Sequence, residues 1–184
     1  MIPTLTRDLL MAMLLGLTAL VVLVLAQINP VANDNQDSVK PPGSLMVCIY
    51  WSSNHNDIDL WGGSPDDSKA TGYSRKSGKT IDLVRDDLGT DNVPHFECEF
   101  ARQLPDGLWA YNVHGYSLTD PVVSVHAEIR LGGGGDGFKL IYETTLDIRQ
   151  KAERTIAQFR LVGGKVVPDS LNIDRKSTRL NSSH

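Results

Sequence analysis

Hydrophobic residues follow two different patterns along this chain, and the first is a single long run. From Leu9 to Ala26 the chain has 18 residues without a charge, and Thr18 is the only polar side chain among them. About 17–20 apolar residues in a helix cross the ~30 Å core of a bilayer, and a helix satisfies its own backbone there. The run therefore predicts a membrane-spanning helix over residues 9–26. The alternative is a buried helix of a soluble protein.

From Leu45 onward the pattern changes to short segments in which apolar and polar residues alternate. Alternation of this kind, interrupted by turn sequences such as Pro105-Asp106-Gly107, is typical of antiparallel sandwiches. We therefore predict a mainly β fold, an antiparallel β-sandwich of about eight strands over residues 45–172. Residues 150–159 have the composition of a helix, but their alternation favours a strand. The predicted strands are 45–51, 56–63, 79–87, 95–101, 107–118, 122–131, 138–148 and 154–162.

The segments between and beyond these two parts have the composition of a tether and of a foreign tail. Residues 27–44 contain three prolines and few large apolar side chains, so we expect a disordered linker. Residues 173–184 end in DRKSTRLNSSH, which a common short-read sequencing adapter encodes in frame. We read residues 173–184 as an artefactual tail, exclude them from fold reasoning, and expect the true C-terminus to be missing.

The charges that flank the apolar run predict its orientation. Arg7 precedes the run, whereas Asp34 and Asp37 follow it before the first lysine. Positive charge stays on the cytoplasmic side, so residues 1–8 are expected in the cytoplasm. We predict a single-pass protein of the bacterial inner membrane with its C-terminal domain in the periplasm. The alternative is a cleaved signal peptide ending near Ala26, although the run exceeds the usual h-region of about 7–15 residues.

Composition and motifs narrow the function classes. The 184 residues carry a net charge of −4, which gives no electrostatic case for binding nucleic acid. The sequence contains no GxSxG, no P-loop and no HExxH. We therefore expect a protein that is not an enzyme.

One acidic residue and a stripe of small residues distinguish the apolar segment from a plain anchor. Asp8 stands at its edge, where an acid is costly and suggests a functional site. Steps of three and four residues from Asp8 reach Ala12, Gly16 and Ala19, and small residues on one stripe let helices pack closely in lipid. The alternative for Asp8 is a solvated cap of the helix N-terminus.

The segment TRDLLMAMLLGLTALVVLVL resembles the ExbD/TolR and flagellar MotB group of ion-driven motor subunits. The resemblance implies that Asp8 carries a proton or sodium ion. It further implies a homodimer whose two helices lie inside a ring of polytopic ExbB/TolQ/MotA-like subunits. The stripe of Ala12, Gly16 and Ala19 is where we expect these two helices to touch. Two departures are that Arg7 adjoins the acid and that no MotB-type peptidoglycan-binding domain is recognisable.

The sandwich region has a resemblance of its own. The segments WSSNHNDIDLWGGSP, IDLVRDD and LPDGLWAYNVHGY are similar to periplasmic β-sandwich domains of unknown function typified by YfaP. The resemblance covers about 70 residues and supports the fold without implying an activity.

Two further candidates concern the chemistry of the sandwich. Asp57, Asp59, Asp86 and Asp87 are expected to converge at one end of the sandwich, where oxygen ligands would suit Ca²⁺; the alternative is solvated strand-end carboxylates. Cys48 alternates with Val47 and Ile49, whereas Cys98 alternates in phase with two phenylalanines, so their inferred faces disagree. We therefore expect no disulfide between them.

These observations predict two alternative functions. The leading one is the dimeric, ion-carrying subunit of a motor or transport energiser driven by the proton-motive force. The other is a non-conducting, membrane-anchored β-sandwich module that binds protein, glycan or Ca²⁺.

Overall fold

A computed structural model describes residues 4–28, 44–90, 93–132 and 137–172. The chain divides into two units, Met1–Lys40 and Pro41–His184, and each is described here by itself. Most of the predicted linker and the predicted tail lie outside the described residues.

The first unit contains one helix, α1 (Thr4–Ile28). It begins earlier than the predicted span of 9–26, because Thr4 to Asp8 are already helical. A stretch of α1, Thr6–Val24, is long and apolar enough to cross a membrane, and none of it is buried. The prediction of one apolar helix that could span a membrane is therefore confirmed.

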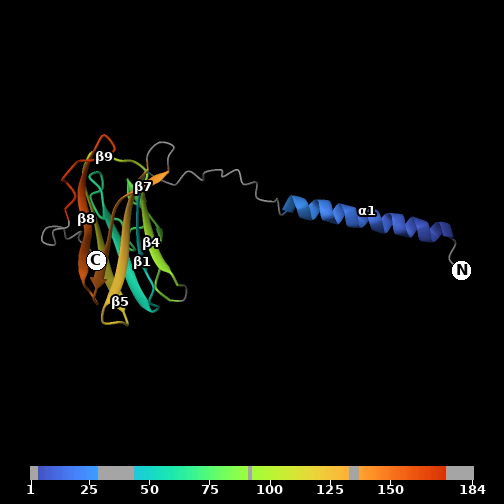
Figure 1. Ribbon diagram of the computed structural model, residues 1–184, viewed down its shortest axis with the longest axis horizontal. Helices are drawn as coiled ribbons and strands as arrows, with labels where there is room; N and C mark the ends of the chain where they lie inside the picture. The colour runs from blue at the N-terminus through green and yellow to red at the C-terminus, as the bar shows by residue number, and fades with distance from the viewer. Residues whose placement is uncertain (1–3, 29–43, 91–92, 133–136, 173–184) are drawn as a thin grey trace. The chain divides into compact units, whose positions relative to one another are not determined.

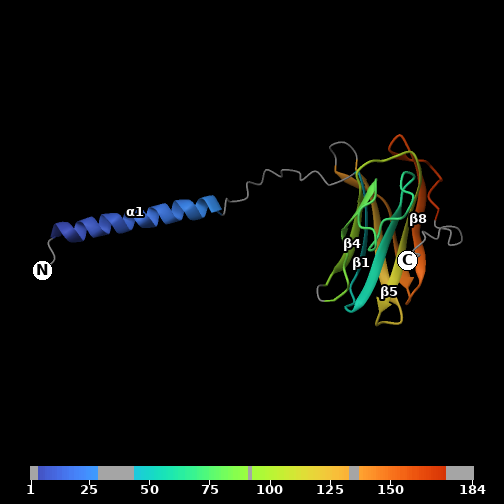
Figure 2. The ribbon, with the colours of Figure 1, turned by 180° about the vertical axis from the view of Figure 1, so that it is seen from behind.

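The second unit is an antiparallel β-sandwich, as predicted, with nine strands among the described residues. Its five-stranded sheet has the order β3-β4-β1-β6-β7 and its four-stranded sheet the order β2-β5-β8-β9. Figure 1 and, from behind, Figure 2 show the two layers. The strands are β1 (Leu45–Trp51), β2 (Asn56–Gly63), β3 (Ile81–Arg85), β4 (His95–Ala101), β5 (Gly107–Leu118), β6 (Val123–Gly132), β7 (Phe138–Ile148), β8 (Glu153–Val162) and β9 (Lys165–Val166).

The core lies between the two sheets and is formed by alternate residues of most strands. Val47, Ile49 and Trp51 share the inner face of β1, as the alternation predicts. Trp109, Tyr111 and Phe159 are the largest side chains that are fully buried. Residues 153–159 belong to β8, so the strand prediction for this segment is confirmed over the helical alternative.

The prediction that Cys48 and Cys98 are unpaired is wrong, because they form a disulfide. They are direct partners in the antiparallel pairing of β1 and β4, with their Cα atoms 4.2 Å apart. Such a distance is typical of the close, non-hydrogen-bonded pairs of antiparallel strands. The prediction fails at β4, because hydrophobicity places Phe96, Phe100 and therefore Cys98 on the face toward the core, whereas these residues lie on the outer face.

The alternation of β4 is in fact the reverse of the expected one. His95, Glu97, Glu99 and Ala101 are fully buried, whereas Phe96 and Phe100 are only half-buried. Phe96 and Phe100 therefore share the outer face with Cys98, and their cross-strand partners are Tyr50 and Met46 of β1. The aromatic contact between Tyr50 and Phe96, with ring centroids 6.3 Å apart, flanks the disulfide on this face.

Replacing Trp51 with alanine tests the core. Trp51 is 3% exposed, and its indole Nε1 donates to the Asn56 carbonyl at 2.9 Å. Because the substitution leaves a large cavity and an unpaired carbonyl, we expect a loss of roughly 3–5 kcal/mol in unfolding free energy. The measurement is denaturant unfolding of residues 44–172, which contain the whole core; exposed Leu108→Ala, the control, should cost about 0.5 kcal/mol or less. A helical far-UV spectrum of this fragment would contradict the fold.

Candidate functional site

Four carboxylates from three neighbouring segments converge beside the edge strand β2. Asp57 and Asp59 lie on β2, Asp86 directly follows β3, and Glu97 comes from β4. Oxygens of Asp59, Asp86 and Glu97 all lie within 4.8 Å of one another. Asp57 is close enough to Asp59 and Asp86 for their charges to act on it. We call Asp57, Asp59, Asp86 and Glu97 the carboxylate cluster.

Glu97 holds this cluster together because it crosses from one sheet to the other. Its Oε2 accepts a hydrogen bond of 2.7 Å from the backbone N–H of Leu60 on β2. Its Oε1 accepts one of 3.1 Å from the backbone N–H of Asp87. An edge strand leaves backbone groups without a partner strand, so this carboxylate satisfies a buried N–H that the sheet does not. Glu97 therefore has a structural reason to face inward.

Burial dominates the electrostatics of the cluster, since it penalises the charged form of a carboxyl group. It raises the pKa of Asp57 to about 6, with the charges of Asp59 and Asp86 adding to the effect. Burial also raises the pKa of Asp59 against the hydrogen bond from His114, and it raises the pKa of Glu97 well above its usual value. The nearby bases are Lys76, whose Nζ is 2.8 Å from Asp86, and His114, whose Nδ1 is 3.3 Å from Asp59.

A fifth carboxyl group, Glu99, lies next to Glu97 on the inner face of β4. It is fully buried against Gly62 and Tyr111, and any side chain at position 62 would collide with its carboxyl group. Burial, followed by the charge of Glu97, raises the pKa of Glu99 well above its ordinary range. The sandwich thus encloses two acidic side chains on adjacent inward positions of a single strand.

Of the four residues that the sequence predicts as a metal site, Asp59 and Asp86 have carboxylate oxygens within 4.8 Å of each other. Asp57 is close enough for the charges of the other three to act on it, but both oxygens of Asp87 are taken up elsewhere. Asp87 Oδ1 accepts from the Gly89 N–H at 3.0 Å, and Oδ2 is 2.8 Å from Arg85 Nη2. Although burial raises its pKa, hydrogen bonds from Gly89 and other groups lower the pKa of Asp87 overall. Ca²⁺ stays a prediction, with Glu97 as the fourth carboxylate and further oxygens needed for the usual six to eight.

Sequence reasoning missed Glu97, Glu99 and His114, and one signal could have found the first two. Pairing Cys48 with Cys98 places Phe96 and Phe100 on the outer face of β4, which leaves both glutamates facing the core. His114 gave no comparable signal. It reaches Asp59 because β5 pairs with β2 in a register that places the two residues opposite each other.

Aromatic side chains border the cluster on the β2 and β5 side. Trp61 contacts Tyr73 with ring centroids 5.3 Å apart, and Tyr73 contacts Tyr116 at 5.5 Å. Lys151 Nζ lies 4.4 Å from the centroid of the Tyr116 ring, which is a cation–π geometry. Carboxylates next to aromatic rings favour the binding of cationic groups. The ammonium group of Lys151 already occupies such a position, over the ring of Tyr116.

Asp8 does not lie at the N-terminal cap of the helix, which is where the alternative interpretation places it. Because α1 begins at Thr4, Asp8 lies beyond its first turn and inside the stretch that could cross a membrane. Its Oδ1 is 3.7 Å from Arg7 Nε, and both side chains are largely exposed. Ala12, Gly16 and Ala19 are exposed as well, and nothing lies within 4 Å of where a Gly16 side chain would begin.

Comparison with known proteins found no matching family model, no matching curated protein and no matching solved structure.

The buried carboxyl groups predict that the sandwich loses stability as pH rises. A group whose pKa is raised by folding keeps its proton in the folded chain after the unfolded chain has released it. Its stabilising contribution is therefore complete below the usual glutamate value of about 4.3 and declines above it, by up to ~1.4 kcal/mol per pH unit for each proton. We expect the unfolding free energy to fall from pH 5 to pH 8.

Glu99→Gln should make this pH dependence shallower, because it removes one of the buried titrating groups. Asp147→Asn, on the exposed face of β7, is the control and should leave the slope unchanged. The measurement is denaturant unfolding at several pH values. Unfolding free energies that are level or rise between pH 5 and pH 8 would contradict burial of these carboxyl groups.

Proposed function

We propose that this protein displays a disulfide-bonded β-sandwich outside the cytoplasm as a binding module anchored by one membrane helix. The observation that carries the proposal is the apolar stretch Thr6–Val24, which is exposed along its whole length. Exposed apolar surface of this extent is unfavourable in water, and a bilayer removes it. The sandwich is a separate unit with its own core, so it does not need the helix in order to fold.

The disulfide between Cys48 and Cys98 supports the orientation. Disulfides persist in oxidising compartments such as the periplasm and are rare in the cytosol. Arg7 before the span, with Asp34 and Asp37 after it, favours the same orientation by the positive-inside rule. Two independent kinds of chemistry, thiol oxidation and charge asymmetry, therefore favour a domain in the periplasm of a bacterial inner-membrane protein.

The carboxylate cluster and its aromatic border are the part of the module whose chemistry favours a ligand. Asp57 Oδ1 and Asp86 Oδ1 are buried without a hydrogen-bond partner among the described residues. Tyr116, 41% exposed, offers an aromatic face nearby. This combination supports a cationic ligand, Ca²⁺ included, over an acidic one.

Topology can be measured directly with a reporter that is active only outside the cytoplasm. Fused after Asn172, it should be active, and the protein should stay in the membrane pellet with its N-terminus intact. As a matched control, Arg7→Glu combined with Asp34→Lys and Asp37→Lys reverses the charge asymmetry and should reduce the activity. A released, soluble form that begins near Gln27 would show that the apolar segment is a cleaved signal peptide. It would contradict the proposal of a membrane anchor.

A second candidate function, the ion-carrying subunit of a motor, is favoured by the position of Asp8. Within the span an acid is a functional-site hypothesis by default, and Asp8 lies inside helix α1 and beyond its first turn. In this proposal Asp8 takes up and releases a cation, and the change in charge alters packing against a ring of ExbB/TolQ/MotA-like subunits. Ala12, Gly16 and Ala19 supply the contact between the two helices of a homodimer.

Asp8→Asn separates the two proposals because it keeps the shape of the side chain and removes its titration. A motor subunit should lose proton flux or complementation in cells that carry the ring partner, and Asp8→Glu should keep part of it. In a plain anchor Asp8→Asn should be silent. Gly16→Leu, which keeps Asp8, should disturb only the dimer. If Asp8→Asn shows normal proton flux and is present in the membrane at the wild-type amount, Asp8 does not carry the ion and the motor proposal is contradicted.

A further inference from the structure

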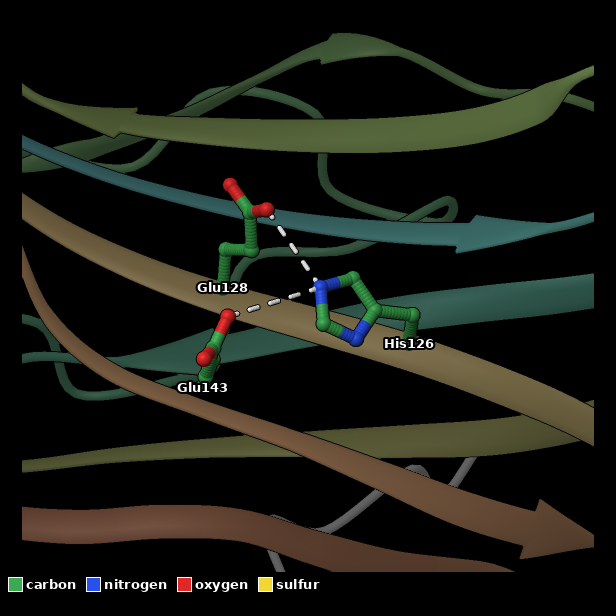
Figure 3. A group of neighbouring side chains, drawn as sticks. All are labelled: His126, Glu128 and Glu143. Atoms are coloured by element: carbon green, nitrogen blue, oxygen red, sulfur yellow. Dashed lines mark hydrogen bonds and ion pairs between the residues drawn. The ribbon is translucent and has the colours of Figure 1, made fainter.

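A histidine and two glutamates meet on the outer face of the five-stranded sheet, away from the carboxylate cluster. His126 and Glu128 are two residues apart on β6 and therefore point to the same face. Glu143 lies on β7 as the direct cross-strand partner of Glu128. Figure 3 shows the imidazole of His126 directed at both carboxylates. Its Nε2 is 3.3 Å from Glu128 Oε1 and 4.0 Å from Glu143 Oε2.

The pairing of Glu128 with Glu143 places two negative charges opposite each other on neighbouring strands. Like charges directly opposite each other on antiparallel strands destabilise the sheet. Arg130 contacts the far oxygen of Glu128, with its Nε 2.8 Å from Oε2. That contact leaves Oε1 of Glu128 and Oε2 of Glu143 facing the imidazole, so the side between the two strands has two carboxylate oxygens and one ring nitrogen.

We propose that His126, Glu128 and Glu143 bind one Zn²⁺ ion on the outer face of β6 and β7. The three ligand atoms lie within 4.8 Å of one another. In a tetrahedral zinc site with bonds of about 2.0–2.2 Å, ligand atoms are about 3.3–3.6 Å apart. Small side-chain rotations therefore suffice to bring all three atoms onto one ion. This site is separate from the binding function proposed above.

The surroundings of the three side chains are those of a metal site that is already oriented. A zinc-bound histidine usually has a hydrogen-bond partner on its other ring nitrogen, and Nδ1 of His126 lies 3.4 Å from Thr145 Oγ1. Arg130 likewise orients Glu128, because it donates a hydrogen bond to Oε2, the carboxylate oxygen that does not face the proposed ion. The three ligands, Thr145 and Arg130 all lie on the paired strands β6 and β7, and strands hold ligands more precisely than loops do.

The ligand set selects the kind of ion. An imidazole nitrogen with two carboxylates suits zinc, whereas Ca²⁺ and Mg²⁺ are bound by oxygen ligands alone. Three protein ligands leave one position of the tetrahedron for water or for a group from a partner molecule. Because Glu143 and His126 are solvent-accessible, with 59% and 40% of their side chains exposed, that position faces outward.

The test is calorimetric titration of ZnCl₂ into the metal-free full chain in detergent micelles at pH 7.5. We expect one saturable site, with binding at least tenfold weaker in His126→Gln and in Glu143→Gln. Calcium chloride and magnesium chloride should not compete. Far-UV spectra check that these surface variants keep the wild-type fold.

Two control variants identify the ion's position. His55→Gln removes an exposed histidine elsewhere on the sandwich and should leave binding unchanged. Asp66→Asn removes an exposed carboxylate that belongs to neither cluster and should also leave binding unchanged. No saturable binding in the wild type, or binding that survives both His126→Gln and Glu143→Gln, would overturn the proposal.

Discussion

The register in which β1 pairs with β4 is the constraint on which the rest of the sandwich depends. It makes Cys48 and Cys98 direct partners on the outer face, and because side chains alternate strictly along a strand, it turns Glu97 and Glu99 inward. A shift of one residue would expose both glutamates, bury Phe96 and separate the cysteines. The disulfide, which closes a separation of 50 residues, fixes this choice covalently. One pairing therefore determines both a structural bond and the placement of two buried acids.

The buried acids have different consequences at the two positions. Glu97 compensates for the open edge of β2, because it accepts the Leu60 N–H and reaches the carboxylates of Asp59 and Asp86. Glu99 faces Gly62 and Tyr111, where burial favours its neutral form. Carboxyl groups packed in this way bind protons or a cation more readily than solvated ones, since both neutralise a charge that water does not reach. The chemistry of the cluster follows from the architecture of an edge strand.

The sequence predicts the class of the fold well because alternation and turn residues act locally. The inner face of β1, with Val47, Ile49 and Trp51, and the strand assignment of β8 followed from that pattern alone. The face of β4 did not, because hydrophobicity favours burying Phe96 and Phe100 over Glu97 and Glu99. That preference was overridden by pairing across the sheet, which depends on residues 50 positions away. Asp57, Asp59 and Asp86 were found for the cluster, whereas Asp87 was diverted by Arg85 and Gly89. The zinc ligands on β6 and β7 became visible only through the register that sets Glu128 opposite Glu143.

The disulfide also supports the proposed location of the sandwich outside the cytoplasm, because disulfides are rare in the cytosol. The most direct test of this account is peptide mapping by mass spectrometry of the full chain, isolated from membranes after alkylation in acid and without reductant. The account predicts one cross-linked species that joins the peptide containing Cys48 to the peptide containing Cys98. Finding both cysteines alkylated on separate peptides would contradict the oxidising location, and a disulfide joining two chains would contradict the β1–β4 register.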